Sequence, residues 1–306
     1  FASDSARVFA AHGVRALLLP GPLPTPVCAW AITELGAAAG VMVTASHNPP
    51  RDNGYKVYLG DGAQIVPPHD AAISARIEAA GFDIPVVDVA HPLIEHPDAS
   101  ILDGYLELVA SVRFRPDLHG VPVAVTSLHG VGGAVLERAF RRAGFDRPIV
   151  VASQQRPDPD FPTVSFPNPE EPGAMDAVVD LASSSGAVLA LANDPDADRL
   201  GVAVPIAAGG WRRLSGDEIG WLLADHILRH TSGPDRLVVT TLVSSSPSRR
   251  GSSRSTSSQS SAPERQRGAL SDAQAPASPA GSSASDGADE GAGIAARPVP
   301  AGSSSG

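Results

Sequence analysis

Residues 187–204 read AVLALANDPDADRLGVAV, and this stretch predicts how the chain folds. It holds two short apolar runs, 187–191 and 200–204, that are typical of buried strands, with a polar loop between them. Further strands are expected at 15–19, 41–44, 55–59, 121–125, 149–151 and 238–243, and helices at 26–39, 70–81, 135–143 and 174–182. Strands that alternate with helices in this way predict a layered α/β protein.

Residues at the expected helix ends support these assignments. Gly40 is expected to close the helix 26–39, and Asp70 to cap the helix that ends at Gly81. Ser215 and Glu218 have the spacing of a capping box, so a further helix is expected to begin there.

The composition narrows the class of protein. The chain has 306 residues, 42% of them hydrophobic, enough for roughly two domains. A net charge of -10 argues against non-specific binding to nucleic acid or to anionic membranes, and no apolar run is long enough for a membrane helix. Cys28 is the only cysteine, which fits a reducing cytoplasm. Because the sequence begins at Phe1, we expect its true start to be missing.

The composition changes after Val243. Residues 244–306 contain 19 serines, no aromatic residue and only three large aliphatic residues. Because these few apolar side chains cannot offset the entropy cost of ordering the segment, this tail is expected to be disordered. Two origins are open: a natural flexible tail, or a frameshift that interrupts the expected strand 238–243.

The loop 44–56 reads TASHNPPRDNGYK and follows an expected strand, where α/β folds place ligand chemistry. Ser46 offers a hydroxyl that could accept or donate a phosphoryl group. Thr44 and Asn48 stand where a Gly-x-Ser-x-Gly turn has glycines, which argues against acyl transfer. A plain surface turn is the alternative.

The loop 193–199 carries carboxylates at alternate positions, Asp194, Asp196 and Asp198. Three loop carboxylates can converge on one hard cation and leave room for water or a phosphate oxygen, as Mg²⁺ sites require. An EF-hand is excluded, because Arg199 and Pro205 stand where that loop needs Gly and Glu. Arg199 adds a planar group suited to phosphate. The alternative is a solvated acidic turn.

These two loops together closely resemble the α-D-phosphohexomutase superfamily, which includes phosphoglucomutases, phosphomannomutases and phosphopentomutases. The resemblance covers most of residues 1–243. Further segments that match are 128–133 (LHGVGG), 157–162 (PDPDFP), 167–170 (PNPE) and 214–218 (LSGDE). It implies mixed-sheet α/β domains and a cytoplasmic enzyme that interconverts sugar 1- and 6-phosphates, or the pentose equivalents, with glucose preferred.

The resemblance also implies roles for single residues. Ser46 would be the phosphoserine, and its phosphate would bind Mg²⁺ together with Asp194, Asp196 and Asp198. Arg199 and Asn48 would contact phosphate or substrate, and His47 and Lys56 would serve in proton transfer or phosphate contact. A hexose 1,6-bisphosphate would be the phosphoryl donor and activator, and the phosphorylated sugar the only partner expected.

The same resemblance divides the chain. It implies a first domain at 1–110 that lacks its early arginine segment, a second at 111–208 with the metal loop, and the start of a third at 209–243. The sugar-selecting loop and the fourth domain's phosphate-binding loop of the family have no match. Because those loops position the substrate, we expect this chain to be inactive as a mutase. The alternatives are a fragment that only binds Mg²⁺, or a phosphatase that releases phosphate from Ser46.

Three residues or segments carry narrower expectations. Lys56 is the only lysine in the chain, which favours a role in proton exchange, because arginine cannot lose a proton near neutral pH. His129 is expected to make a structural hydrogen bond rather than to act in catalysis. The glycines of 130–133 fit either a phosphate cradle or close backbone packing.

Overall fold

The computed structural model describes residues 1–49, 51–234, 236, 238–239 and 293–297. All of these except Val239 belong to one compact unit of the chain. The disorder predicted for residues 244–306 and most of the strand predicted at 238–243 lie outside the described residues. Segment 293–297 is the exception, and it forms a strand.

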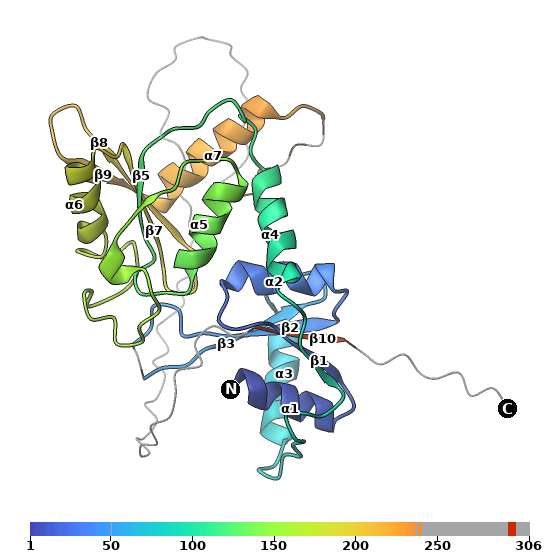
Figure 1. The fold of residues 1–306 in the computed structure, drawn as a ribbon. Coiled ribbons are helices and arrows are strands. Elements are labelled where there is room, and N and C mark those ends of the chain that lie inside the picture. The colour runs from blue at the N-terminus through green and yellow to red at the C-terminus, as the bar shows by residue number, and fades with distance from the viewer. Residues whose placement is uncertain (50, 235, 237, 240–292, 298–306) are drawn as a thin grey trace, which may run out of the picture. The chain divides into compact units, whose positions relative to one another are not determined.

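The first sheet is mixed, as predicted. Its strands are β1 (Arg15–Leu18), β2 (Ala39–Val43), β3 (Tyr55–Leu59), β4 (Ile94–Glu95) and β10 (Gly293–Arg297), in the order β3-β2-β10-β1-β4 (Figure 1). β4 runs parallel to β1, whereas β10 runs antiparallel to both of its neighbours, β1 and β2. β3 pairs with β2 in antiparallel register, so the loop between these two strands begins and ends at the same end of the sheet.

Helices cover this sheet through two separate cores. The helices of this part are α1 (Ala2–Ala11), α2 (Thr25–Glu34), α3 (His69–Ala79) and α4 (Ser100–Ser111). α1 buries Ala2, Ala6 and Ala10, spaced four residues apart, against Ala16 of β1 and neighbouring aliphatic side chains. Small side chains on one stripe let the helix lie close to the sheet. α2 and α4 contribute to the other core.

Two helix ends for which a stop or cap residue was predicted differ from their predictions. α2 ends at Glu34 rather than at residue 39, because Gly36 takes a left-handed φ of 58° and the chain enters β2 at Ala39. α3 begins at His69 after Pro68, and Asp70 lies inside its first turn rather than capping it. An acidic side chain in the first turn still faces the positive end of the helix dipole.

The second sheet is built from residues 123–214. Its strands are β5 (Val123–Thr126), β6 (Ile149–Val150), β7 (Leu189–Asn193), β8 (Leu200–Pro205) and β9 (Trp211–Leu214), in the order β6-β5-β7-β8-β9. β5 is parallel to β6 and β7, while β8 is antiparallel to β7 and β9. β9 lies after residue 208, so this sheet extends past the point at which the second domain was predicted to end.

Three α-helices and one short 3-10 helix accompany this sheet. They are α5 (Gly132–Arg142), α6 (Asp176–Ser185), α7 (Gly216–His230) and the 3-10 turn η1 (Ala152–Gln154). α6 packs Val178 and Ala182 onto a core of small residues from β5, β7 and β8. The predicted capping box at the start of α7 is present: Glu218 N–H donates to Ser215 Oγ, and Ser215 N–H donates to the Glu218 carboxylate.

Candidate functional site

Ser46 lies in the turn that joins β2 to β3, in a strained backbone conformation. Its φ is 54°, and its N–H donates to Thr44 Oγ1 at 3.0 Å. Gly54 makes this turn possible, since a Cβ at Gly54 would overlap the carbonyl oxygen of Thr44. A non-glycine residue in the left-handed region is costly, so the surrounding contacts must hold Ser46 in place.

The acidic loop lies between the antiparallel strands β7 and β8. Asp194 is fully buried, and its Oδ1 accepts hydrogen bonds from the backbone N–H groups of Asp198 and Arg199 at 3.1 and 2.9 Å. Ala197 has a φ of 55°, which tightens the turn. The loop is thus held by its own first carboxylate, and the three aspartates are directed to one side.

The structure brings the serine to this loop. Ser46 Oγ lies 2.8 Å from Asp196 Oδ1 and 3.0 Å from Asp194 Oδ2, and its proton can be donated to either oxygen. His47 Nδ1 lies 3.1 Å from the same hydroxyl. The predicted nucleophile therefore touches two of the three predicted metal ligands, although it comes from a different sheet.

The three carboxylates are arranged to hold a cation. One oxygen each of Asp194, Asp196 and Asp198 lies within 4.8 Å of the others. Oxygen atoms are the donors that Mg²⁺ prefers, so this set fits the predicted metal by its chemistry.

Lys56, on β3, reaches the same carboxylates. Its Nζ lies 2.6 Å from Asp196 Oδ2 and 2.9 Å from Asp198 Oδ2. Burial alone would lower the pKa of Lys56, but its hydrogen bonds with Asp196 and Asp198 outweigh that effect and raise the pKa above its ordinary value. Lys56 therefore stays charged here, whereas the proton exchange expected of it requires a lowered pKa.

The other titratable groups of the site differ in their pKa shifts. Burial, followed by the charge of Asp196, raises the pKa of Asp194 to about 7. Burial acts in the same direction on Asp196, but the hydrogen bond and charge of Lys56 hold the pKa of Asp196 below its ordinary value. Burial, together with the charge of Arg199, lowers the pKa of His47. His47 is therefore mostly neutral near pH 7 and can accept a proton from Ser46.

The two predicted phosphate contacts lie at the edge of this cluster. Arg199 Nε is 3.8 Å from Asp194 Oδ2 and 4.0 Å from Asp198 Oδ1, and its side chain is 47% exposed. An incoming anion can reach it. Asn48 is also exposed; its backbone N–H donates to the Ala45 carbonyl, and its side chain makes no hydrogen bond with any residue that the structure describes.

One residue of the cluster, Thr25, was not predicted from the sequence. It is the first residue of α2, and its side chain and backbone both contact Asp196. The only local signal is the segment Pro24-Thr25-Pro26 at a helix start, where Thr is common in any protein. Nothing in that signal indicates a partner 171 residues away.

His129 and the glycines that follow it support the acidic loop. His129 is buried, and its Nε2 lies 2.8 Å from Thr163 Oγ1, so it makes the structural hydrogen bond that was expected. A Cβ at Gly130 would overlap the backbone of Pro195, and Val131 N–H donates to the Pro195 carbonyl. Close backbone packing thus accounts for Gly130, rather than a phosphate cradle.

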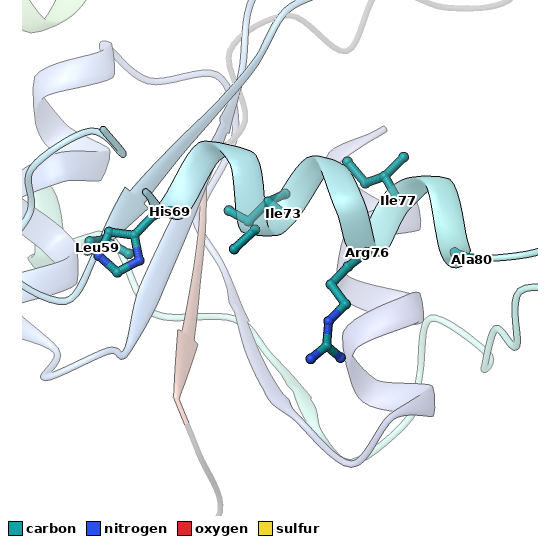
Figure 2. A pocket seen from close by; sticks show the side chains of 7 residues that line it. Leu59, His69, Ile73, Arg76, Ile77 and Ala80 are labelled. Atoms are coloured by element: carbon teal, nitrogen blue, oxygen red, sulfur yellow. The ribbon is translucent and has the colours of Figure 1, made fainter. Parts of the chain in front are cut away.

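A separate hollow lies beside α3. Leu59 of β3 and the side chains of His69, Ile73, Arg76 and Ile77 line it (Figure 2). None of the predicted site residues borders it.

Comparison with known proteins decides the family. Two family models match in succession: phosphoglucomutase/phosphomannomutase α/β/α domain I over residues 1–83, and domain II over residues 103–206. The chain belongs to the α-D-phosphohexomutase superfamily. In this phosphohexomutase chain the Ser46 turn falls within the first model and the aspartate loop within the second.

Individual relatives agree with this assignment. The chain is 46% identical over 252 residues to a probable phosphomannomutase of Haemophilus influenzae, covering 80% of this chain and 51% of that protein. It is 42% identical over 233 residues to a human phosphopentomutase, covering 73% of this chain and 38% of that protein. A solved structure of a candidate phosphomannomutase from Thermus thermophilus superposes with a TM-score of 0.58 at 28% identity, over 73% of this chain and 49% of that one.

The phosphohexomutase chain spans about half, or less, of the length of these relatives. Within the ranges that the structure describes, none of its helices combines the length and the apolar character needed to cross a membrane.

Proposed function

We propose that this chain carries the phosphoryl-accepting part of a phosphosugar mutase, with Ser46 as the residue that becomes phosphorylated. The contact of Ser46 Oγ with Asp196 and Asp194 carries the proposal. A hydroxyl held against paired carboxylates can lose its proton and, once phosphorylated, presents its phosphate oxygens to whatever cation the carboxylates bind.

The transfer itself needs few groups. As the bond between Ser46 Oγ and phosphorus forms, the bond between phosphorus and a sugar oxygen breaks, and the hydroxyl proton passes to that oxygen. His47 Nδ1, 3.1 Å from Ser46 Oγ and mostly neutral, is placed to relay the proton. A divalent cation held by the aspartates would neutralise charge on the phosphoryl group during transfer. The reverse transfer from Ser46 to a second sugar oxygen completes a mutase cycle.

The positive charges of the site have separate tasks in this scheme. Lys56 is paired with Asp196 and Asp198, so it holds those carboxylates and remains charged. Arg199 is exposed and only loosely paired, so it is available to an incoming phosphate. Asn48 lies in the exposed part of the same turn and is proposed as a weaker contact.

The proposed partners are a phosphorylated sugar and a hexose 1,6-bisphosphate as donor, with Mg²⁺ as the cation. The relatives' names cover several sugars: mannose, pentose and, for a human protein 40% identical over 235 residues, synthesis of glucose 1,6-bisphosphate. Glucose remains our preferred sugar. The single cysteine favours a cytoplasmic reaction.

Phosphoryl uptake tests the proposal directly. The chain is incubated with Mg²⁺ and glucose 1,6-bisphosphate, and intact mass and peptide mapping follow the phosphate. We expect one phosphoryl group on Ser46, none on Ser46→Ala, and normal uptake by Ser111→Ala, which alters an exposed serine of α4. Phosphate at another residue, or uptake by Ser46→Ala, would contradict the assignment.

The same experiment separates the alternatives. Mg²⁺ binding without phosphoryl uptake would identify a fragment that only binds metal. Uptake followed by release of inorganic phosphate would identify a phosphatase. Uptake followed by conversion of added glucose 1-phosphate to glucose 6-phosphate would identify a mutase, and we expect no measurable conversion by this chain.

A further inference from the structure

Thr25 makes two hydrogen bonds to one aspartate of the site. Its backbone N–H donates to the Asp196 carbonyl oxygen at 2.9 Å, and its Oγ1 donates to Asp196 Oδ2 at 3.1 Å. Both residues are buried, with 4% of Thr25 and 2% of Asp196 exposed. Water therefore cannot easily replace either hydrogen bond.

The two oxygens of Asp196 face different partners. Oδ1 lies 2.8 Å from Ser46 Oγ, while Oδ2 accepts from Lys56 Nζ and from Thr25 Oγ1. Lys56 reaches its partner through a long flexible side chain and divides its hydrogen bonds between Asp196 and Asp198. Thr25 has a short side chain on the first turn of a helix, so its hydroxyl can take fewer positions than the Lys56 amino group can.

We propose that Thr25 is a positioning residue of this site: it sets the orientation of the Asp196 carboxylate so that one oxygen faces Ser46. The inference rests on the proposed function, because it assigns Thr25 a part in metal and phosphoryl chemistry. Thr25 touches neither Ser46 nor the reacting phosphate, and it acts through Asp196 alone.

The start of α2 explains why a threonine suits this position. The first N–H groups of a helix lack partners within the helix, and the Asp196 carbonyl satisfies that of Thr25. Pro24 precedes it in an extended conformation, with φ -53° and ψ 140°, which directs the chain into the helix. The positive end of the helix dipole also favours the carboxylate of Asp196.

A packing role is the competing explanation, since Val27 and Cys28 of the same helix are fully buried. Thr25→Val preserves the shape and the backbone N–H but removes the hydroxyl, whereas Thr25→Ser keeps the hydroxyl. Thr33→Val is the matched control: it makes the same change on the same helix, where the hydroxyl bonds to the Trp30 carbonyl at the surface.

The experiment measures Mn²⁺ affinity by electron paramagnetic resonance on the full chain, alongside thermal melting and phosphoryl uptake from glucose 1,6-bisphosphate. We expect Thr25→Val to bind Mn²⁺ about tenfold more weakly, and Thr25→Ser and Thr33→Val to bind within about twofold of the original chain. The melting curves separate a loss of positioning from a loss of folding.

Several outcomes would overturn the proposal. These are unchanged Mn²⁺ affinity in folded Thr25→Val, no recovery in Thr25→Ser, or a matching loss in Thr33→Val. If Thr25→Val does not fold, Thr25→Ala takes its place, and failure of both to fold makes Thr25 a packing residue. Absence of Mn²⁺ binding by the original chain also rejects the proposal. Absence of phosphoryl uptake alone rejects the proposed function and leaves the effect of Thr25 on Mn²⁺ binding to be judged by itself.

Discussion

Ser46 and Asp196 are 150 residues apart in the sequence, and a hydrogen bond of 2.8 Å joins their side chains. Ser46 follows a strand of the first sheet, and Asp196 follows a strand of the second. The candidate site therefore forms where a loop that follows a strand of the first sheet contacts a loop that follows a strand of the second. Any change that moves one loop is expected to affect both the serine and the metal ligands.

Asp196→Asn should weaken binding of Mg²⁺ or Mn²⁺ by about tenfold or more, because an amide supplies a neutral oxygen in place of an anionic one. Titration calorimetry with either ion measures the change. Asp180→Asn is a suitable control, since Asp180 is an exposed residue of α6. Equal affinities for Asp196→Asn and the original chain would remove Asp196 from the metal site.

Lys56→Met should destabilise the chain in the absence of metal by about 1–3 kcal/mol, because two carboxylates lose their cationic partner. The pKa of Lys56 is raised and that of Asp196 lowered, so the pair stabilises the fold between the ordinary pKa values of Asp and Lys, roughly pH 4 to 10. Denaturant unfolding at pH 7 measures the loss.

Lys56→Arg keeps the charge and serves as the companion variant. It should recover most of the lost stability, and in an active mutase it should retain phosphate binding. Near-normal turnover of Lys56→Arg in such an enzyme would reject proton exchange by Lys56, a role that the raised pKa already disfavours.

Asp194→Asn should change stability in a pH-dependent way in metal-free protein. The pKa of Asp194 is raised to about 7, so the folded state favours the protonated carboxyl group. The stability that this group contributes is fully present below about pH 4 and is lost as the pH rises to about 7. At about pH 4 or below the variant should match the original chain, and at pH 8 it should be more stable, because each pKa unit corresponds to about 1.4 kcal/mol.

Urea unfolding at about pH 4 and at pH 8 measures this difference. Asp180→Asn, which makes the same change at an exposed position of α6, is the matched control. A variant that is less stable than the original chain at pH 8 would show that the buried charge of Asp194 is well compensated.

Gly54→Ala should disrupt the Ser46 turn. The added Cβ would overlap the Thr44 carbonyl oxygen, and the backbone of the β2–β3 loop has to move to relieve the overlap. We expect a loss of about 2–4 kcal/mol in unfolding free energy and a loss of phosphoryl uptake. Gly81→Ala is the control, since a Cβ there meets no atom within 4 Å.

Local patterns were sufficient to predict much of this protein. Short apolar runs predicted the strands that became β1, β3, β7 and β8, and the Ser215 and Glu218 spacing predicted the cap of α7. Such features are encoded by neighbouring residues, so they can be recognised without a fold. α1 was not predicted, because its apolar stripe consists mainly of alanines and becomes a core only against β1.

In the candidate site, too, some features were predictable from local sequence and others were not. Ser46 and the three aspartates were identified from the sequence, because each loop carries its own pattern of residue types. The hydrogen bond from Thr25 to Asp196, the pairing of Lys56 with Asp196, and the place of β10 between β1 and β2 were decided by tertiary structure. These contacts join segments far apart in the chain. Their geometry depends on how whole sheets and helices pack, and no local sequence pattern records that packing.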